Sequence, residues 1–154
     1  MIYLSKSEKE TQKIAGDLAL KIMKNPSTRL RASVITLEGK LGAGKTTFVK
    51  GFAKALGIKA KIKSPTFVLM KKYPILPITY NLKPKTCLYH LDCYRVRDHR
   101  DLITLDLKTI FNESRSIILI EWPERVSKIL PKKLIKVHID HVSESKRKIS
   151  WERV

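Results

Sequence analysis

Apolar side chains recur at helical spacing in three stretches of the chain. Within residues 7–24 they return every four positions, which predicts an amphipathic helix that ends before Pro26. A second helical stretch covers residues 47–56 and stops at Gly57. Residues 98–111 carry apolar side chains at roughly helical spacing, so we expect a third helix there.

Short apolar runs between these stretches predict strands. Residues 32–37, 86–92 and 116–121 are predicted strands, and the last of them, the most apolar run, is typical of a central parallel strand. Residues 134–140 and 147–153 alternate between apolar and polar side chains, which predicts an antiparallel pair at the C-terminal end. Strands that alternate with helices indicate an α/β fold with a mostly parallel central sheet flanked by helices.

The segment between the second helix and the next strand has a different character. Residues 61–70 combine a turn at Ser64-Pro65 with a short predicted strand, and residues 71–85 contain three prolines, typical of a loop or an edge hairpin. At 154 residues, the chain has the usual length of one domain, so we expect a single domain over residues 1–154.

Charge is the most unusual feature of the composition. The chain has 32 Lys and Arg against 14 Asp and Glu, a net charge of +18. Such an excess favours a polyanionic partner, nucleic acid first, although a lysine-rich surface that keeps the protein in solution is an equally good interpretation. The positive residues are spread from Lys6 to Arg153 rather than gathered in one motif.

Cysteine content and hydropathy bear on the compartment. With two cysteines, Cys87 and Cys93, the chain has no disulfide framework, and we expect free thiols in a reducing cytoplasm. No stretch approaches the ~20 apolar residues that cross a bilayer, and the first residues lack the apolar core of a secretory signal. These observations predict a cytoplasmic protein without a membrane partner.

A glycine-rich loop lies between the first predicted strand and the second helix. Gly39, Gly44, Lys45 and Thr46 fit the P-loop pattern G-x-x-x-x-G-K-[ST]. Glycines let the backbone wrap so that amide N–H groups point at phosphate oxygens, and the following helix adds its positive N-terminus. Lys45 is expected to reach the terminal phosphates and Thr46 to bind Mg²⁺. The full set of expected nucleotide contacts in the loop is Gly39, Leu41, Gly42, Ala43, Gly44, Lys45, Thr46 and Thr47.

Two acidic residues end predicted strands. Asp92 closes the run TCLYHLD and Glu121 closes SIILIE, so both are expected at the carboxyl edge of the sheet, where α/β proteins bind ligands. A P-loop protein needs a carboxylate there to help hold Mg²⁺ and a group to orient water. Asp92 and Glu121 are therefore the candidate catalytic and metal-binding residues, although either alone could be a helix cap or a surface acid.

Thr66 follows the predicted turn in the sequence SPTF. It could reach the γ-phosphate side of the metal and act as a nucleotide-sensing switch. A turn that simply leads into a strand explains the same residues equally well.

These motifs together resemble those of a known family. GKLGAGKTTFVKGFAKALG, SPTFVLM, YHLDCYR and LIEWPER, in this order and spacing, are similar to the TsaE (also called YjeE) family of small bacterial P-loop ATPases. The resemblance extends from Glu10-Thr11 to the C-terminal strands. SPTF and EWPER beside this loop are much more specific than the loop alone.

The resemblance implies a function. It implies that the protein binds and hydrolyses ATP with Mg²⁺ and is required for threonylcarbamoyladenosine modification at position 37 of tRNAs that read ANN codons. TsaB and TsaD are the implied partners and carry out the transfer. The resemblance implies that ATP hydrolysis resets the TsaB–TsaD complex between turnovers and that tRNA is contacted indirectly through it. By the same resemblance, Thr11 lies near the adenine, Trp122 matches the family's EW pair, and Lys146-Arg147 loosely matches a C-terminal residue on the nucleotide.

Three features depart from the family pattern. Lys40 stands where the family often has an acid, Asp106 replaces a common glycine after Leu105, and residues 71–85 are longer than usual. The first removes a negative charge beside the phosphate loop. The second predicts different packing of the middle helix, and the third an altered edge of the protein.

Two other functions fit parts of the sequence. A small P-loop kinase would also need an acceptor pocket and an arginine-bearing lid, for which the chain has little length, although Arg95, Arg97 and Arg100 cluster after Asp92. A basic nucleic-acid binding module would use the positive surface directly. The chain lacks stacking motifs of the RNP type and is only 7% aromatic, which weakens that alternative.

Overall fold

A computed structural model describes residues 1–24, 31–65, 67–75 and 86–154 of the chain. The helices in this part are α1 (Glu8–Lys24), α2 (Lys45–Ala55) and α3 (Leu107–Asn112), with the 3-10 helices η3 (His99–Leu105) and η4 (Pro123–Ile129). The strands are β1 (Ile2–Ser5), β2 (Ser33–Glu38), β3 (Met70–Pro74), β4 (Cys87–Asp92), β5 (Ile117–Glu121), β6 (Ile135–His141) and β7 (Arg147–Arg153).

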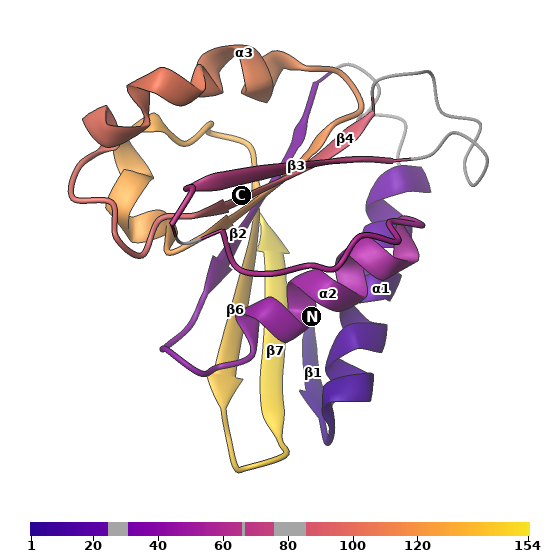
Figure 1. Cartoon of the computed structure of the whole chain (residues 1–154). Helices are drawn as coiled ribbons and strands as arrows, with labels where there is room; N and C mark the ends of the chain where they lie inside the picture. The colour runs from indigo at the N-terminus through magenta and orange to yellow at the C-terminus, as the bar shows by residue number, and fades with distance from the viewer. Residues whose placement is uncertain (25–30, 66, 76–85) are drawn as a thin grey trace.

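All seven described strands form one mixed sheet, in the order β1-β7-β6-β2-β5-β4-β3 (Figure 1). The neighbours among β6, β2, β5 and β4 are parallel, whereas β3, β7 and β1 each join antiparallel to a neighbour. The expectation of a mostly parallel sheet therefore holds only for its centre. The short turn between the consecutive strands β6 and β7 permits only antiparallel pairing of these two strands.

Alternation along the central strands gives the sheet two buried faces. In β5, Ile117 and Leu119 join the core beneath α1 and α2, while Ile118 and Ile120 join the core beneath α3 and the 3-10 helices. Side chains of a strand point to opposite faces with a period of two, so a continuous apolar run is buried on both sides. This confirms the interpretation of residues 116–121 as a central strand.

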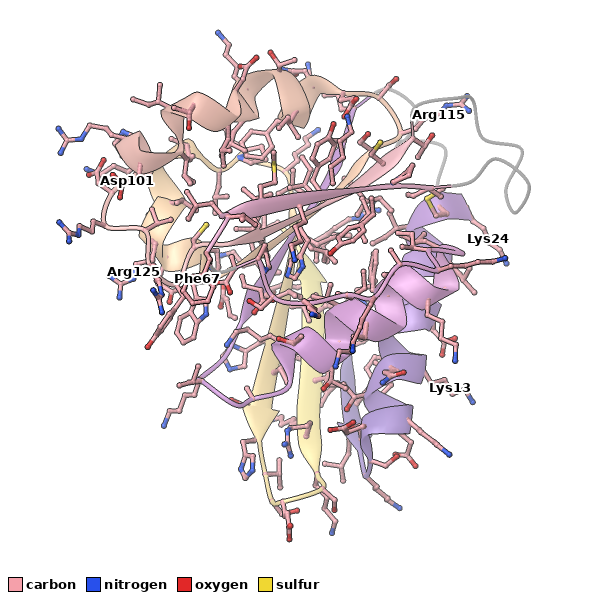
Figure 2. The ribbon with its side chains drawn as sticks, viewed as in Figure 1. Lys13, Lys24, Phe67, Asp101, Arg115 and Arg125 are labelled. Carbon is pink, nitrogen blue, oxygen red and sulfur yellow. The ribbon has the colours of Figure 1, made fainter. Side chains whose placement is uncertain are left out.

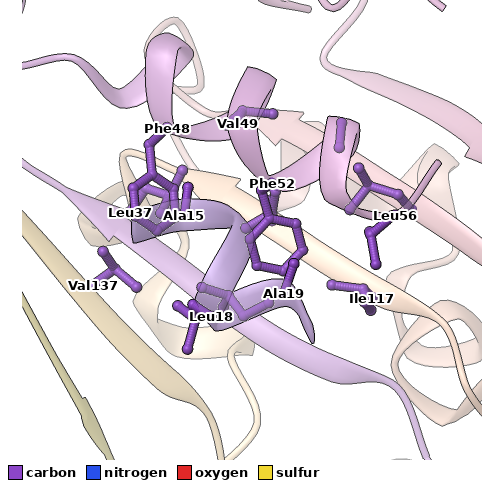
Figure 3. Packing of buried hydrophobic residues seen from close by; sticks show 14 of the residues in the cluster. Ala15, Leu18, Ala19, Leu37, Phe48, Val49, Phe52, Leu56, Ile117 and Val137 are labelled. Atoms are coloured by element: carbon purple, nitrogen blue, oxygen red, sulfur yellow. The ribbon is translucent and has the colours of Figure 1, made fainter. Parts of the chain in front are cut away.

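Helices α1 and α2 cover one face and pack closely on each other. Figure 3 shows Leu18, Phe48 and Phe52 meeting over the sheet. A side chain at Gly51 of α2 would lie 2.3 Å from the backbone of Gln12 in α1. The close approach of the two helices therefore requires glycine at this position.

Several predicted elements match the structure and others differ. The helix expected over 7–24, the strands and the C-terminal antiparallel pair are confirmed within two residues of their ends. The expected helix over 98–111 is instead two short helices, because Asp106 adopts a left-handed conformation with φ 44°. The strand expected within 61–70 begins only at Met70, and β1 and η4 were not predicted.

Candidate functional site

The glycine-rich loop joins β2 to α2, and its glycines adopt conformations that other residues avoid. Gly39, Gly42 and Gly44 have φ angles of 145°, 77° and 105°. A side chain at Gly39 would also lie 2.4 Å from the carbonyl oxygen of Ile139, whereas one at Gly42 would meet open space. The loop therefore turns tightly against the end of β6 and leaves its middle open.

Lys45 is the first residue of α2, and its side chain folds back over the loop. Its Nζ donates to the carbonyl oxygens of Gly39 at 2.6 Å and Lys40 at 3.0 Å. The ammonium also lies 4.0 Å from the centre of the Trp122 ring, a cation–π contact. Burial lowers the pKa of Lys45 from its ordinary 10.5, and nearby carboxylates, Glu121 foremost, oppose part of that shift.

Asp92 and Glu121 are neighbours at the carboxyl edge of the sheet, as the sequence predicted. They are register partners at the ends of the parallel strands β4 and β5. The Asp92 carboxylate accepts hydrogen bonds from the Ser64 hydroxyl at 2.5 Å and the Tyr94 amide at 3.0 Å. Both acids are almost fully buried, so hydrogen-bonding partners within the protein, rather than solvent, set the orientation of their carboxylates.

His90 is a partner of Glu121 that the sequence analysis did not identify. It is fully buried in β4, and its Nε2 lies 2.8 Å from Oε1 of Glu121. Its position two residues before Asp92 was visible in the sequence, but two strands had to be paired before the contact could be recognised. Ser64 was noted only as part of a turn.

Trp122 follows Glu121 in a left-handed conformation, with φ 58° and ψ 52°. Few residues other than glycine adopt this conformation. It turns the chain from β5 into η4 and places the Trp122 ring between Lys45 and Tyr94, whose ring centre lies 5.0 Å away. The turn thus brings an aromatic side chain to the glycine-rich loop.

These residues surround a pocket of about 430 Å³. Its walls come from the glycine-rich loop, the start of α2, the connection before β3 and the ends of β4 and β5. The lining residues are Leu41, Gly42, Gly44, Lys45, Thr46, Thr47, Ser64, Asp92, Tyr94, Glu121 and Trp122. Nine of them were candidate site residues from the sequence, and the fold brings them together.

Three expected nucleotide contacts do not line this pocket. Gly39 lies at the base of the loop, and the side chain of Ala43 is buried beneath it. Thr11 is buried in α1, where its hydroxyl lies 2.7 Å from that of Ser5. The expected switch residue Thr66 lies outside the described residues; the following Phe67 is strongly exposed and packs under Arg95.

A larger hollow of about 600 Å³ lies elsewhere, between η4 and the β2–β6 pair. Its lining includes Thr36, Glu38 and Lys136 but neither the glycine-rich backbone nor Lys45. The smaller pocket is lined by the glycine-rich loop, a buried cation and two carboxylates, and is therefore the candidate site.

The donor set of the pocket fits magnesium better than a transition metal. The hydroxyl of Thr46 and the carboxylates of Asp92 and Glu121 are oxygen donors. No group of three or more His, Cys, Asp or Glu residues suited to a metal occurs among the described residues. Mg²⁺ needs few protein ligands because it keeps several waters and shares substrate phosphates, so a sparse oxygen set suits it.

Comparison with known proteins identifies relatives of this chain. The model of the family described as "Threonylcarbamoyl adenosine biosynthesis protein TsaE" matches residues 5–149. A Bacillus subtilis protein named "tRNA threonylcarbamoyladenosine biosynthesis protein TsaE" is 37% identical over 123 residues, which cover 79% of this chain and 70% of that protein. A protein of the same name from Aquifex aeolicus is 37% identical over 145 residues, 93% of this chain and 89% of that one.

A solved structure agrees with the sequence relatives. The crystal structure of Bacillus YdiB aligns with a TM-score of 0.74 and 30% identity, and covers all of this chain and 85% of that one. No helix among the described residues is both long and apolar enough to cross a membrane. A match over nearly the whole chain, in sequence and in fold, shows that this protein belongs to the TsaE family.

Proposed function

We propose that this protein is a Mg²⁺-dependent P-loop ATPase that acts in the threonylcarbamoyladenosine modification of tRNA. The observation that carries the proposal is the pocket, where Lys45 and Thr46 at the start of α2 face Asp92 and Glu121 at the strand ends. A cation, a hydroxyl and two acids around open backbone amides form the arrangement that binds a nucleoside triphosphate and its metal.

Each residue of the loop has a role in this proposal. Gly39, Gly42 and Gly44 allow the loop to wrap around phosphates, and the amides of the pocket-lining residues Leu41, Gly42 and Gly44 to Thr47 donate to phosphate oxygens. Lys45 leaves the carbonyl oxygens that it contacts and binds the terminal phosphates instead. Ala43 contributes backbone only, and its amide donates to the carbonyl oxygen of Lys40.

Thr46, Asp92 and Glu121 would hold the metal. When bound, Mg²⁺ neutralises charge on the phosphate oxygens as the terminal phosphoryl group is transferred to water. Glu121 orients the attacking water or accepts its proton, and Asp92, held by Ser64 and Tyr94, supports the metal side. Burial of both acids keeps competing water away from these groups.

The names of the relatives support the pathway. The proteins from Bacillus subtilis and Aquifex aeolicus are named for tRNA threonylcarbamoyladenosine biosynthesis. We propose that this protein works in the cytoplasm with the TsaB–TsaD complex, which performs the transfer on tRNAs reading ANN codons. Thr66 and Trp122 are the residues proposed to signal the bound nucleotide to those partners.

Binding and turnover of ATP test the proposal directly. Lys45→Ala should abolish binding of ATP in titration calorimetry, while Lys50→Ala, an exposed lysine of the same helix, should leave it unchanged. Glu121→Gln should retain ATP and hydrolyse it slowly, at a reduced but measurable rate. Equal ATP binding by the Lys45→Ala and Lys50→Ala variants would refute the assignment of the loop.

Reconstituted modification tests the pathway. TsaB, TsaD and tRNA are incubated with ATP and a preformed threonylcarbamoyl adenylate, which releases AMP on transfer, with and without this protein, and modified adenosine is quantified. We expect sustained formation only when the protein is present. Robust phosphoryl transfer to a nucleoside or sugar would instead favour a small P-loop kinase.

Direct RNA contact is a second candidate function, favoured by one observation. Residues 39–91 contain eleven lysines and no Asp or Glu, so most of the +18 charge falls in this segment. Lys50 and Lys54 of α2 are exposed, and the connection after α2 exposes further lysines beside it. On α1, Lys13 and Lys24 point away from the molecule (Figure 2).

The salt dependence of binding distinguishes this candidate. Each lysine that neutralises an RNA phosphate adds to the slope of log affinity against log salt. Lys50→Gln with Lys54→Gln should lower that slope for tRNA, whereas the same two changes at the exposed Lys132 and Lys133 should not. Equal salt slopes in the two double variants would exclude direct contact of Lys50 and Lys54 with tRNA and leave only binding through the partner complex.

A further inference from the structure

His90 is buried in the middle of the sheet although it carries two polar ring nitrogens. The side chain is fully inaccessible to solvent, and β4 is buried along all six of its residues. Its Nε2 lies 2.8 Å from Oε1 of Glu121, whereas Nδ1 has no hydrogen-bond partner among the residues that the structure describes. A buried polar group without a partner costs free energy, so the position calls for an explanation.

The chemistry of the two side chains determines the direction of the hydrogen bond. A carboxylate only accepts, so the nitrogen facing Glu121 carries the hydrogen and donates it. In the neutral ring, Nδ1 is then a bare acceptor. His90 thus donates from the nitrogen that faces the site and leaves its other nitrogen within the core.

The Glu121 carboxylate has two oxygens with different surroundings. Oε1 receives the bond from His90, and the described residues give Oε2 no hydrogen bond. Glu121 also lines the pocket beside Lys45 and Asp92. One oxygen is therefore held within the protein and the other remains for a ligand, a metal or a water molecule.

We propose that His90 is a positioning residue that sets the orientation of the Glu121 carboxylate for ATP hydrolysis, an inference that rests on the proposed ATPase function. By binding Oε1, His90 restricts rotation of the carboxylate about its last bond and directs Oε2 at the pocket. The sheet holds the two residues together, since β4 and β5 are parallel neighbours with Asp92 opposite Glu121 and His90 opposite Leu119. His90 does not line the pocket itself.

The backbone of β4 and β5 pairs independently of the His90 side chain, so the side chain can be changed without removing the ladder. His90→Leu fills similar space and removes the donor. His90→Gln keeps a donor at a similar reach to Nε2, and His90→Asn keeps a donor that is too short. The three variants therefore distinguish the effects of side-chain volume, of a hydrogen-bond donor and of the distance that the donor reaches.

The test measures kcat for ATP hydrolysis, binding of ATP by calorimetry and thermal unfolding for each variant. Loss of an outer hydrogen-bonding partner commonly lowers activity about 10–100-fold. We expect such a loss of kcat in His90→Leu and His90→Asn, partial recovery in His90→Gln, and ATP affinity within a factor of ~3 of wild type. If His90→Leu does not fold, the Gln and Asn pair gives the same comparison.

A double variant tests whether His90 acts through Glu121. Because both changes would remove the same function, His90→Leu in a Glu121→Gln background should lower kcat no further. Additive losses, or equal kcat in His90→Gln and His90→Asn, would overturn the positioning role. A wild-type protein that binds ATP and never hydrolyses it, alone or with partners, would refute the proposed ATPase function instead, and His90's role with it.

Discussion

The Nε atom of Arg147 donates a hydrogen bond of 2.9 Å to the carbonyl oxygen of Ala43, across 104 residues of sequence. Its Nη1 also donates to the carbonyl oxygens of Ser143, Glu144 and Lys146 within the β6–β7 turn. The Arg147 guanidinium therefore links the β6–β7 hairpin to the glycine-rich loop by hydrogen bonds. The sequence had linked Lys146-Arg147 to the nucleotide only loosely, through the family resemblance.

Replacing Arg147 should loosen the loop and weaken nucleotide binding. Hydrogen bonds from a charged group contribute about 1.5–3 kcal/mol, and a lysine cannot reproduce the planar fork of arginine. We expect Arg147→Lys and Arg147→Ala to lower ATP affinity about tenfold, which corresponds to ~1.4 kcal/mol. Calorimetry measures the effect, and the nearby exposed Lys148→Ala serves as the control. ATP affinity that is the same in all three variants would exclude this role for Arg147.

Trp122 should report nucleotide binding by fluorescence. Lys45 lies 4.0 Å from its ring centre, and we expect the ammonium to move to phosphate when ATP binds. The chain has two tryptophans, and Trp151 stacks on Tyr3. A fluorescence change on adding ATP should therefore survive Trp151→Phe and disappear in Trp122→Phe. If the fluorescence change disappears in Trp151→Phe and survives in Trp122→Phe, the expected movement of Lys45 away from the Trp122 ring is contradicted.

Gly51→Ala should destabilise the fold although alanine favours helices by about 1 kcal/mol. The new methyl group would lie 2.3 Å from backbone atoms of Gln12, so α1 and α2 must separate. Overpacking of this kind costs about 1–3 kcal/mol. Gly16→Ala is the matched control, since its methyl group would lie 3.2 Å from the Ala55 side chain and 3.6 Å from the Gly51 carbonyl oxygen, without the close backbone approach. Urea unfolding should show a lower midpoint for Gly51→Ala than for Gly16→Ala. Equal midpoints in the two variants would contradict this prediction.

The Cys93 thiol should resist ionisation in the folded protein. Burial raises its pKa from 9.0 to about 12, with nearby carboxylates adding to the shift. Between these values the unfolded chain loses the proton and the folded protein keeps it, so stability falls as pH rises above 9. We expect up to about 1.4 kcal/mol per pH unit, measured by urea unfolding in EDTA. Cys93→Ala should remove this part of the dependence of stability on pH. The same dependence in Cys93→Ala as in the wild type would contradict the prediction.

Short-range patterns identified most of the candidate site. The P-loop spacing located Lys45 and Thr46, and two acidic strand ends located Asp92 and Glu121. These predictions depend on features within a few residues: glycine for tight turns, apolar runs for buried strands, and polar residues where a strand stops. The pocket gathers these four residues as the sequence indicated.

Other partners became visible only after distant segments were placed together. His90 reaches Glu121 across two strands, Ser64 reaches Asp92 across 28 residues, and Arg147 reaches Ala43. Nothing in the local sequence distinguishes these side chains from other buried or turn residues. The break at Asp106 also escaped prediction, because the apolar spacing around it continues as in one helix.

The sequence by itself determined the order of helices and central strands, the phosphate loop and the family resemblance, because backbone propensities and motif spacing act locally. The tertiary structure decided which strands pair, including the edge strand β1 beside β7, and which side chains hold the two acids. Strand pairing and side-chain hydrogen bonds join residues far apart in the chain. They depend on the free energy of the whole packed molecule, which no local pattern contains.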